Sequence, residues 1–317
     1  MNKHTQYCII CGKKFDENCK PSKEHIIPEA LGNTKLITYN VCTECNNSLG
    51  GHVDSYLVSH VLVKIIRSLK LSKDKNIRIF DKKMTDDKER TYRTDGLKLE
   101  IAPEVKIDKS SGHAQITTSS VDEGIKIARG ILRKTFGKTE SEIDAILSDP
   151  DKFTHIATRQ LQAGTFSINA DLDLSRLRLA IIKMAYEFAV EKLGEIYTAD
   201  EYAAVLRAYL KAGRDGKRIF SEKEADDISK RCHCMDSFTK TIADILKSYK
   251  ETANGRSINC LVYLFKNDSN QMLCLIRILD EDLLTFSVLL SENAVDYPIE
   301  KSGYIAVVLD DNNLIET

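Results

Sequence analysis

Four cysteines near the start of the chain are spaced as ligands of one metal ion. They form two Cys-x-x-Cys pairs, Cys8 with Cys11 and Cys42 with Cys45. Four thiolates can hold one tetrahedral Zn²⁺, and two cysteines three apart reach one ion from a tight turn or a helix start. Such an ion staples a segment too short to bury enough apolar surface by itself. We predict a structural zinc at these four residues; the alternatives are buried free cysteines or a disulfide pair.

A second group of residues, between and directly after these pairs, can carry acid–base and metal chemistry. Glu24 and His25 are adjacent, and Asn46 directly follows Cys45. A histidine can take a proton from water near neutral pH, because its ordinary pKa lies close to neutrality. Carboxylate and amide oxygens are ligands that suit Mg²⁺. In a strand the side chains of Glu24 and His25 would point to opposite faces, unless the strand ends there.

Taken together, these residues resemble the HNH endonucleases, also called ββα-metal or His-Me finger nucleases. The resemblance rests on Glu24-His25, on the Ile-Ile-Pro at residues 26–28 and on Asn46 after the last cysteine. The spacing is similar to that of phage resolvases of the endonuclease VII type. The segment from Glu24 to Gly32 also looks like HNH nucleases of bacterial phage defence. This resemblance covers residues 1–60 only.

The resemblance implies a metal-dependent endonuclease that hydrolyses phosphodiester bonds in DNA. In that family His25 would be the general base, and Glu24 and Asn46 would hold a catalytic Mg²⁺ or Mn²⁺. Asn40, on the second strand, would orient the imidazole or the phosphate. Many relatives carry histidine at the position of Asn46, which leaves the identity of the catalytic metal open.

Several alternatives to these assignments stay open. His52 and Asp54 lie on the following helical segment and are further metal-ligand candidates, although His52 also fits a surface or capping role. His25 could be a core histidine. At the level of function, the alternatives are a non-catalytic zinc knuckle that binds nucleic acid or protein, and a nuclease that acts on RNA. A knuckle needs only its cysteines, so the presence of Glu24, His25 and Asn46 together favours the enzyme.

The stretch at residues 61–83 is locally basic. Eight lysines and arginines stand there against two aspartates: Lys64, Arg67, Lys70, Lys73, Lys75, Arg78, Lys82 and Lys83 against Asp74 and Asp81. We predict that Lys64, Arg67 and Lys70 contact DNA phosphates; the alternative is a solvated face of an amphipathic helix. A second basic group, at residues 207–218, is expected to be solvated surface; the alternative is a contact with nucleic acid or a ligand.

Length and composition place the chain among ordinary globular proteins. It has 317 residues, a formal net charge of −1 and nine cysteines. Its first residues lack an apolar signal segment, and its longest apolar run, residues 177–190, is broken by Arg178, Lys183 and Glu187. We therefore expect a cytoplasmic protein that does not partner a membrane, and we also consider a homodimer. Disulfides are rare in the cytoplasm, so the other five cysteines are expected to be buried as small apolar residues.

The predicted fold class is α+β with three segments. Residues 1–60 form the zinc-stapled ββα-metal nuclease module, residues 61–255 a mixed, mostly helical α/β region, and residues 256–317 an antiparallel β meander. Apolar spacing predicts helices at residues 61–71, 121–136, 139–147, 172–197, 199–212 and 236–249. Asp173 or Ser175 is expected to cap the start of the helix at 172–197, and Thr139 or Ser141 the start of the helix at 139–147. It predicts strands at residues 23–27, 36–41, 97–101, 105–107, 113–118, 154–162, 258–265, 272–279, 283–290 and 305–309. Residues 43–56 read as a helix that Gly50-Gly51 interrupts, and Cys232-His233-Cys234 is not expected to bind metal.

Overall fold

The protein is described by a computed structural model, which covers residues 5–70, 84–86, 89–95, 98–154, 173–234, 257–300, 302–311 and 313–316. The chain packs as two compact units. One contains Met1–Lys73 together with Asp171–Thr317, and the other contains Asp74–Ala170. The predicted N-terminal and C-terminal segments therefore share a unit, while the domain boundaries at residues 60 and 255 stay a prediction. The α+β class with an antiparallel C-terminal sheet is confirmed.

Two antiparallel strands followed by helices build residues 5–70. The elements are β1 (Pro21–His25), a 3₁₀ turn (Glu29–Leu31), β2 (Ile37–Cys42), α1 (Thr43–Leu49), a π-helical turn (Gly50–Asp54), α2 (Ser55–Ser59) and α3 (Val61–Lys70). Strand β1 ends before Pro28, which has no backbone N–H to donate to a sheet. The predicted order of strand, strand and helix is confirmed.

The helix after β2 passes through its two glycines instead of stopping at them. Gly50 and Gly51 open a π-helical turn that ends at Asp54, and α2 follows directly. Glycine weakens an α-helix by roughly 1 kcal/mol relative to alanine, which helps a wider turn to form there. The wider turn changes the direction in which the following side chains point, and in this way it orients the side chain of Asp54.

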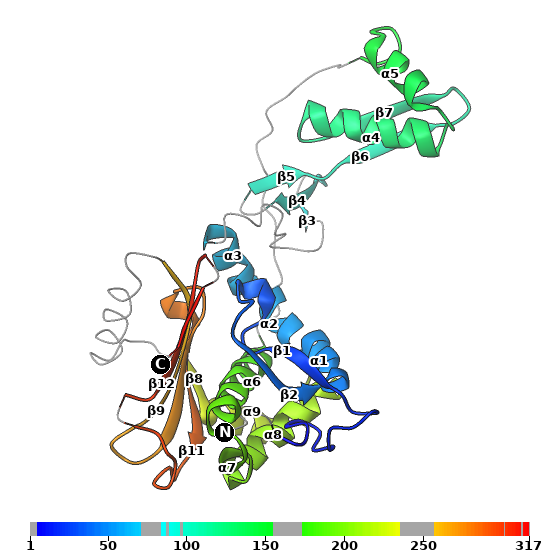
Figure 1. Cartoon of the computed structure of the whole chain (residues 1–317). Coiled ribbons are helices and arrows are strands. Elements are labelled where there is room, and N and C mark those ends of the chain that lie inside the picture. The colour runs from blue at the N-terminus through cyan, green and yellow to red at the C-terminus, as the bar shows by residue number, and fades with distance from the viewer. Residues whose placement is uncertain are drawn as a thin grey trace. The chain divides into compact units, whose positions relative to one another are not determined.

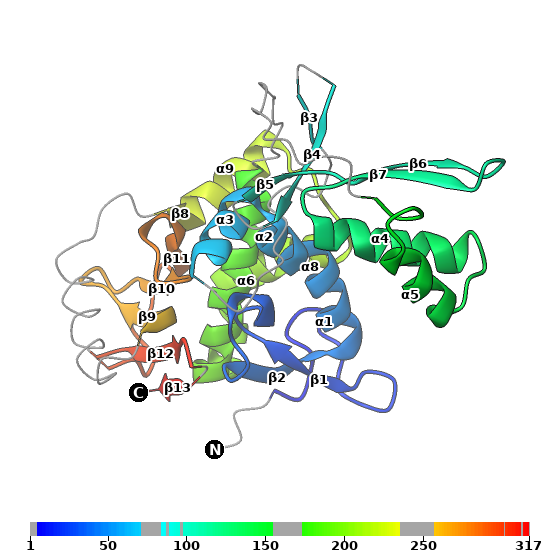
Figure 2. The ribbon, with the colours of Figure 1, turned by 90° about the horizontal axis from the view of Figure 1, so that it is seen from above.

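Helix α6 (Leu174–Leu193) is the centre of the first unit. Asp173 caps its start by accepting hydrogen bonds from the backbone N–H groups of Ser175 and Arg176, as predicted. Residues 179–190 are buried on every side of the helix. Figures 1 and 2 show why: α6 lies between the β1–β2–α1 layer and the C-terminal sheet and packs against both. One hydrophobic core therefore joins the two ends of the chain.

The C-terminal sheet is antiparallel with the strand order β13-β12-β9-β10-β11-β8. Its strands are β8 (Cys232–Cys234), β9 (Ile258–Lys266), β10 (Met272–Arg277), β11 (Thr285–Ser291), β12 (Tyr304–Leu309) and β13 (Leu314–Glu316). Strands β9, β10 and β11 pair consecutively, as a meander requires. Strand β12 then returns to pair with β9, which is a Greek-key order. Residues 258–264 of β9 are buried without interruption, and β9 pairs with β10 on one edge and with β12 on the other.

Short helices complete the first unit around α6. They are α7 (Glu195–Thr198), α8 (Glu201–Arg214) and α9 (Glu222–Arg231). Gly213 lets α8 approach closely, since a Cβ built there would lie 2.6 Å from Leu179 Cδ2 and 3.0 Å from Val53 Cγ2. Helix α9 was not predicted, although Ser221 and Glu224 form a capping box at its start. Its apolar face is too small to produce a helical pattern of apolar residues in the sequence, because Ile228 is its only buried residue.

The second unit contains two small sheets and two helices. Strands β3 (Met84–Thr85), β4 (Thr91–Asp95) and β5 (Lys98–Ile101) form one sheet, and β6 (Glu104–Asp108) and β7 (His113–Thr117) form a hairpin. Helices α4 (Val121–Lys134) and α5 (Glu140–Ser148) follow, and Thr139 caps α5 as predicted. Ion pairs from Arg129 and Arg133 to Glu140 link the two helices.

Some predictions fall outside the described residues. These are the strand after Thr154, the helix at residues 236–249, and the basic residues between Lys73 and Lys83. Within the ranges that are described, no helix is both long and apolar enough to span a membrane.

Candidate metal centre and active site

The four predicted zinc ligands come together. Cys8 and Cys11 lie in the turn before β1, Cys42 ends β2, and Cys45 lies in the first turn of α1. Their four Sγ atoms lie within 4.8 Å of one another, and those of Cys11 and Cys42 are 3.9 Å apart. Ligands of a tetrahedral zinc with bonds of about 2.3 Å stand about 3.8 Å apart. The cluster therefore fits a zinc ion, and the four cysteines could bind one.

Hydrogen bonds favour the thiolate of Cys8, the form that binds metal, whereas the hydrogen bond to Cys8 raises the pKa of Cys45 and burial raises that of Cys11. The backbone N–H of Cys42 donates to Cys8 Sγ at 3.3 Å, and a side-chain hydrogen bond from Cys45 lowers the pKa of Cys8 to about 5. Arg214, at the end of α8, donates from Nη1 to Cys45 Sγ at 3.4 Å. This last contact was not expected, because Arg214 belongs to the basic group predicted to be solvated surface.

None of the nine cysteines, all of which lie in the described ranges, forms a disulfide. Outside the cluster, Cys19, Cys232, Cys260 and Cys274 are buried as expected, whereas Cys234 is exposed. Strand β8 pairs Cys232–Cys234 with β11, and among the described residues no other group of three or more His, Cys, Asp or Glu side chains is placed to hold a metal ion.

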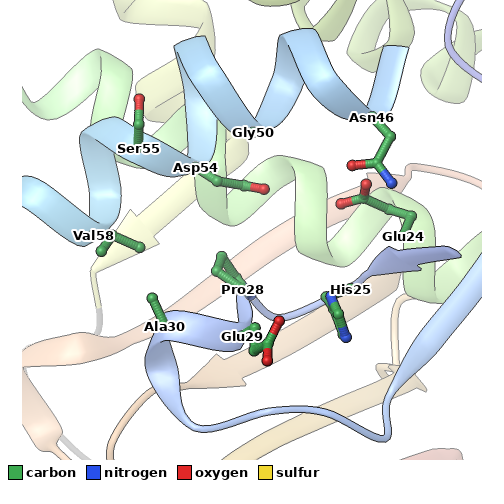
Figure 3. Close-up of a pocket in the computed structure, with 10 residues that line it drawn as sticks. All are labelled: Glu24, His25, Pro28, Glu29, Ala30, Asn46, Gly50, Asp54, Ser55 and Val58. Atoms are coloured by element: carbon green, nitrogen blue, oxygen red, sulfur yellow. The ribbon is translucent and has the colours of Figure 1, made fainter. Parts of the chain in front are cut away.

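A pocket of about 270 Å³ brings the predicted catalytic residues together. Glu24 and His25 reach it from the end of β1, and Asn46 reaches it from α1. Asp54 joins them from the π-helical turn. Figure 3 shows the carboxylates of Glu24 and Asp54 and the amide of Asn46 on one side of the pocket, with the His25 ring turned away from them. This is the opposite-face placement expected for neighbours in a strand.

Asn46 is held so that its oxygen is available. Its Nδ2 donates to Ser22 Oγ at 2.9 Å and to the carbonyl oxygen of Lys23 at 2.8 Å. Both contacts use the nitrogen, so Oδ1 is left on the pocket side, where Figure 3 shows it near Glu24. An amide oxygen in this place suits a hard cation.

Beneath the pocket, Glu24 and Asp54 share one ammonium. Lys183 of α6 donates from Nζ to Glu24 Oε1, to Asp54 Oδ2 at 2.9 Å and to the carbonyl oxygen of His25 at 3.2 Å. A third carboxylate, that of Glu187, lies 3.5 Å from the same Nζ. Lys183 and Glu187 are fully buried, and Glu24 is 3% exposed. This cluster was not predicted.

The charges of this cluster decide its protonation. Burial would lower the pKa of Lys183, but Asp54, Glu187 and Glu24 raise it well above its ordinary value, so the side chain is an ammonium. Burial raises the pKa of Glu24, and the Lys183 charge opposes that rise. Burial raises the pKa of Glu187 well above its ordinary value, which favours its neutral form. With Glu24 and Asp54 ionised, two carboxylates and one ammonium leave a net negative charge, which a cation in the pocket would offset.

His25 has the properties of a proton acceptor. Its side chain is half-buried, and Nε2 makes no hydrogen bond to the described part of the chain. Burial lowers its pKa below the ordinary value of 6.5, so the ring is neutral at pH 7. A neutral imidazole can take a proton from a water molecule in the pocket.

Asn40 and His52 do not line the pocket. Asn40 is buried; its Oδ1 accepts from the backbone N–H of Thr5 at 2.8 Å, and its Nδ2 donates to Glu191 of α6 at 3.2 Å. His52 is exposed and its Nδ1 lies 2.9 Å from the carbonyl oxygen of Arg214. Their assigned roles therefore stay predictions without a contact to the site.

The three predicted DNA contacts lie on α3 in different environments. Lys64 is 8% exposed, Arg67 is partly buried, and Lys70 is exposed. Lys70 Nζ donates to the carbonyl oxygen of Asp280 at 2.7 Å and pairs with Glu281 at 3.1 Å. Lys64 is therefore the least accessible of the three to a phosphate.

Comparison with known proteins gives one match. The family model described as HNH endonuclease matches residues 8–62. No curated protein and no solved structure matches the chain. The matched range contains the four-cysteine cluster and the pocket residues Glu24, His25, Asn46 and Asp54. Residues 8–62 are therefore an HNH endonuclease module whose four cysteines are placed to bind a metal ion.

Proposed function

We propose that this protein is a metal-dependent endonuclease that hydrolyses phosphodiester bonds in DNA. The observation that carries the proposal is the pocket: inside an HNH module, it is lined by Glu24, Asp54 and Asn46 and by His25, whose buried Nε2 makes no hydrogen bond to the described residues. A core histidine would instead have its ring nitrogens hydrogen-bonded. A zinc knuckle would have no use for converging carboxylates.

The donor set fits Mg²⁺ or Mn²⁺. Asp54 Oδ1 is buried and makes no hydrogen bond to the described residues, and Asn46 Oδ1 is left open by the contacts of its nitrogen. Together with Glu24, these side chains offer hard oxygen ligands and a net negative charge. A bound cation would stabilise negative charge on the phosphate and on the leaving oxygen.

The protein's own groups supply the rest of the reaction. His25 takes a proton from the attacking water, which raises the nucleophilicity of that water as it approaches phosphorus in line with the leaving oxygen. The main-chain carbonyl of His25 accepts a hydrogen bond from Lys183, which fixes the end of β1 and hence the base. We assign a structural zinc to Cys8, Cys11, Cys42 and Cys45, because this cluster joins the loop before β1 to the start of α1.

The test compares substrates and metal. Purified full-length protein is incubated with supercoiled plasmid and with RNA, each with Mg²⁺, with Mn²⁺ or with EDTA. We expect plasmid nicking that needs the divalent ion and that EDTA stops. Cleavage of RNA without cleavage of plasmid would show that the substrate is RNA and not DNA. Binding without any cleavage would support the zinc knuckle. A role in phage defence, which the resemblance suggests, stays a prediction.

A further inference from the structure

Lys183 lies outside the matched HNH residues, yet it is the group that joins the two carboxylates of the pocket. We propose that Lys183 is a positioning residue of this active site: it fixes the carboxylates of Glu24 and Asp54 so that their free oxygens bind the divalent ion with Asn46. This inference rests on the proposed function. It means that residues 8–62 and helix α6 both contribute side chains to the site.

In each of the two carboxylates, one oxygen accepts a hydrogen bond from Lys183 and the other does not. Lys183 Nζ donates to Oε1 of Glu24 and to Oδ2 of Asp54. Asp54 Oδ1 is buried without a hydrogen bond to the described residues, and Glu24 Oε2 makes none either. Each carboxylate therefore has one oxygen that could bind an ion in the pocket, while Lys183 holds the other oxygen.

The two carboxylates come from different elements of the chain. Glu24 lies near the end of β1, and Asp54 ends the π-helical turn. Their like charges repel each other, and the Asp54 charge raises the pKa of Glu24. A cation between them removes the repulsion and sets their separation. Lys183 can do this because its third hydrogen bond, to the carbonyl of His25, also fixes the backbone of β1.

Simple packing does not explain this arrangement. Buried ion pairs are often no more stabilising than apolar side chains of the same volume, because each charge must leave water. Here Lys183 and Glu187 interrupt an otherwise apolar stretch of α6, and both are fully buried. Lys183 is also inaccessible to substrate, so its effect must pass through the groups that it holds. Groups that orient metal ligands typically change metal affinity or activity by about 10–100-fold when removed.

The decisive variant cannot weaken ion binding through net charge. Lys183→Met with Glu187→Gln removes one positive charge and at most one negative charge, because burial raises the pKa of Glu187 well above its ordinary value. The cluster therefore becomes no more positive, and weaker ion binding reports the lost orientation. The control is Lys192→Met on the same helix, because Lys192 pairs with Glu316 instead of the pocket. Binding of Mn²⁺ to the full-length, zinc-loaded protein is measured by titration without nucleic acid, and zinc content reports folding.

We expect the double variant to retain zinc and to bind Mn²⁺ about tenfold or more weakly, while Lys192→Met binds like the wild type. Affinity within twofold of wild type would mean that Lys183 only fills space, and tighter binding would mean that it competes with the cation; either result overturns the inference. If the double variant loses zinc, Lys183→Gln replaces it, with weaker Mn²⁺ binding again expected and unchanged binding again decisive against the inference.

The same titration separates this inference from the proposed function. Asn46→Ala must weaken Mn²⁺ binding if the ion lies in the pocket. If it does not, or if the wild type binds no Mn²⁺, the proposed metal site fails and the role of Lys183 fails with it. If Asn46→Ala weakens binding but the double variant does not, only the role of Lys183 fails.

Discussion

At the scale of single residues, His25 is the group on which the proposed chemistry depends most directly. His25→Ala should lower plasmid cleavage by roughly 10²–10⁴-fold, the usual loss when a positioned general base is removed. Zinc content and Mn²⁺ binding should stay at wild-type values, because His25 holds neither ion in the proposed site. Cleavage and metal binding are measured on the same preparation.

The matched control for that variant is His52→Ala. His52 is exposed and contacts the carbonyl oxygen of Arg214, so its loss should leave cleavage within a few-fold of wild type. If His25→Ala cleaves as fast as wild type while His52→Ala does not, the base has been assigned to the wrong histidine.

Asn46 belongs to the same scale but should behave differently. Asn46→Ala removes one oxygen ligand, so the Mg²⁺ concentration for half-maximal cleavage should rise about tenfold or more, and high Mg²⁺ should restore part of the rate. The neighbouring Asn47 is exposed and does not line the pocket, so Asn47→Ala is the control. A defect in Asn46→Ala that no Mg²⁺ concentration relieves would argue against a ligand role.

At the scale of elements, the four-cysteine cluster holds the loop before β1 against the start of α1. Cys42→Ser should abolish zinc binding and unfold this part of the chain, because Cys42 both supplies a thiolate and caps α1. Metal analysis and amide hydrogen exchange measure the two effects. Cys19→Ser is the control, since Cys19 is buried nearby but is not in the cluster. Full zinc occupancy in Cys42→Ser would exclude this ligand set.

Helix α3 carries the predicted DNA contacts. Arg67 and Lys70 are the more accessible of the three, so Arg67→Ala with Lys70→Ala should flatten the slope of log K against log salt by about one unit per lost phosphate contact. Affinity is measured on duplex DNA at several salt concentrations. An unchanged slope would show that these side chains make contacts within the protein and not with DNA, consistent with the contacts of Lys70 to Asp280 and Glu281.

At the scale of the whole molecule, the nuclease module and the C-terminal half form one unit. Helix α6 supplies Lys183 to the pocket, α8 supplies Arg214 to the cysteine cluster, and Tyr186 donates to the carbonyl oxygen of Ile9 at 3.0 Å. A fragment that ends before α6 would lose all three contacts and would expose the core that residues 8–62 share with α6. Zinc alone is therefore not expected to make the module independent.

The second unit can be removed with a different result. Replacing residues 74–170 by a flexible glycine–serine linker should leave zinc content, Mn²⁺ binding and cooperative thermal unfolding of the remaining chain intact, because every described site residue lies in the first unit. Metal analysis, ion titration and calorimetry test this. Loss of zinc would show that the second unit is needed for the fold of the first. A homodimer stays a prediction at this scale.

Much of the site was predictable from the sequence because its signals are local. The spacing of Cys8, Cys11, Cys42 and Cys45 fixes a ligand set within a short segment, and all four thiols converge. The same holds for helices with clear periodicity and caps, such as α6 with Asp173 and α5 with Thr139.

Tertiary structure alone decided how that site is completed. Lys183 lies 159 residues from Glu24, and only the packing of α6 beneath β1 brings their side chains together. The sequence did contain a signal: Lys183 and Glu187 stand one helical turn apart in an apolar run, and buried charges need partners. It could not name those partners. From the sequence, Asp54 was one ligand candidate among several, and the π-helical turn is what brings its carboxylate to Lys183.

The sequence likewise allowed β12 to pair with β11 or with β9, and in the folded chain it pairs with β9. Periodicity reports which face of an element is buried, whereas the surface that covers it depends on the whole chain.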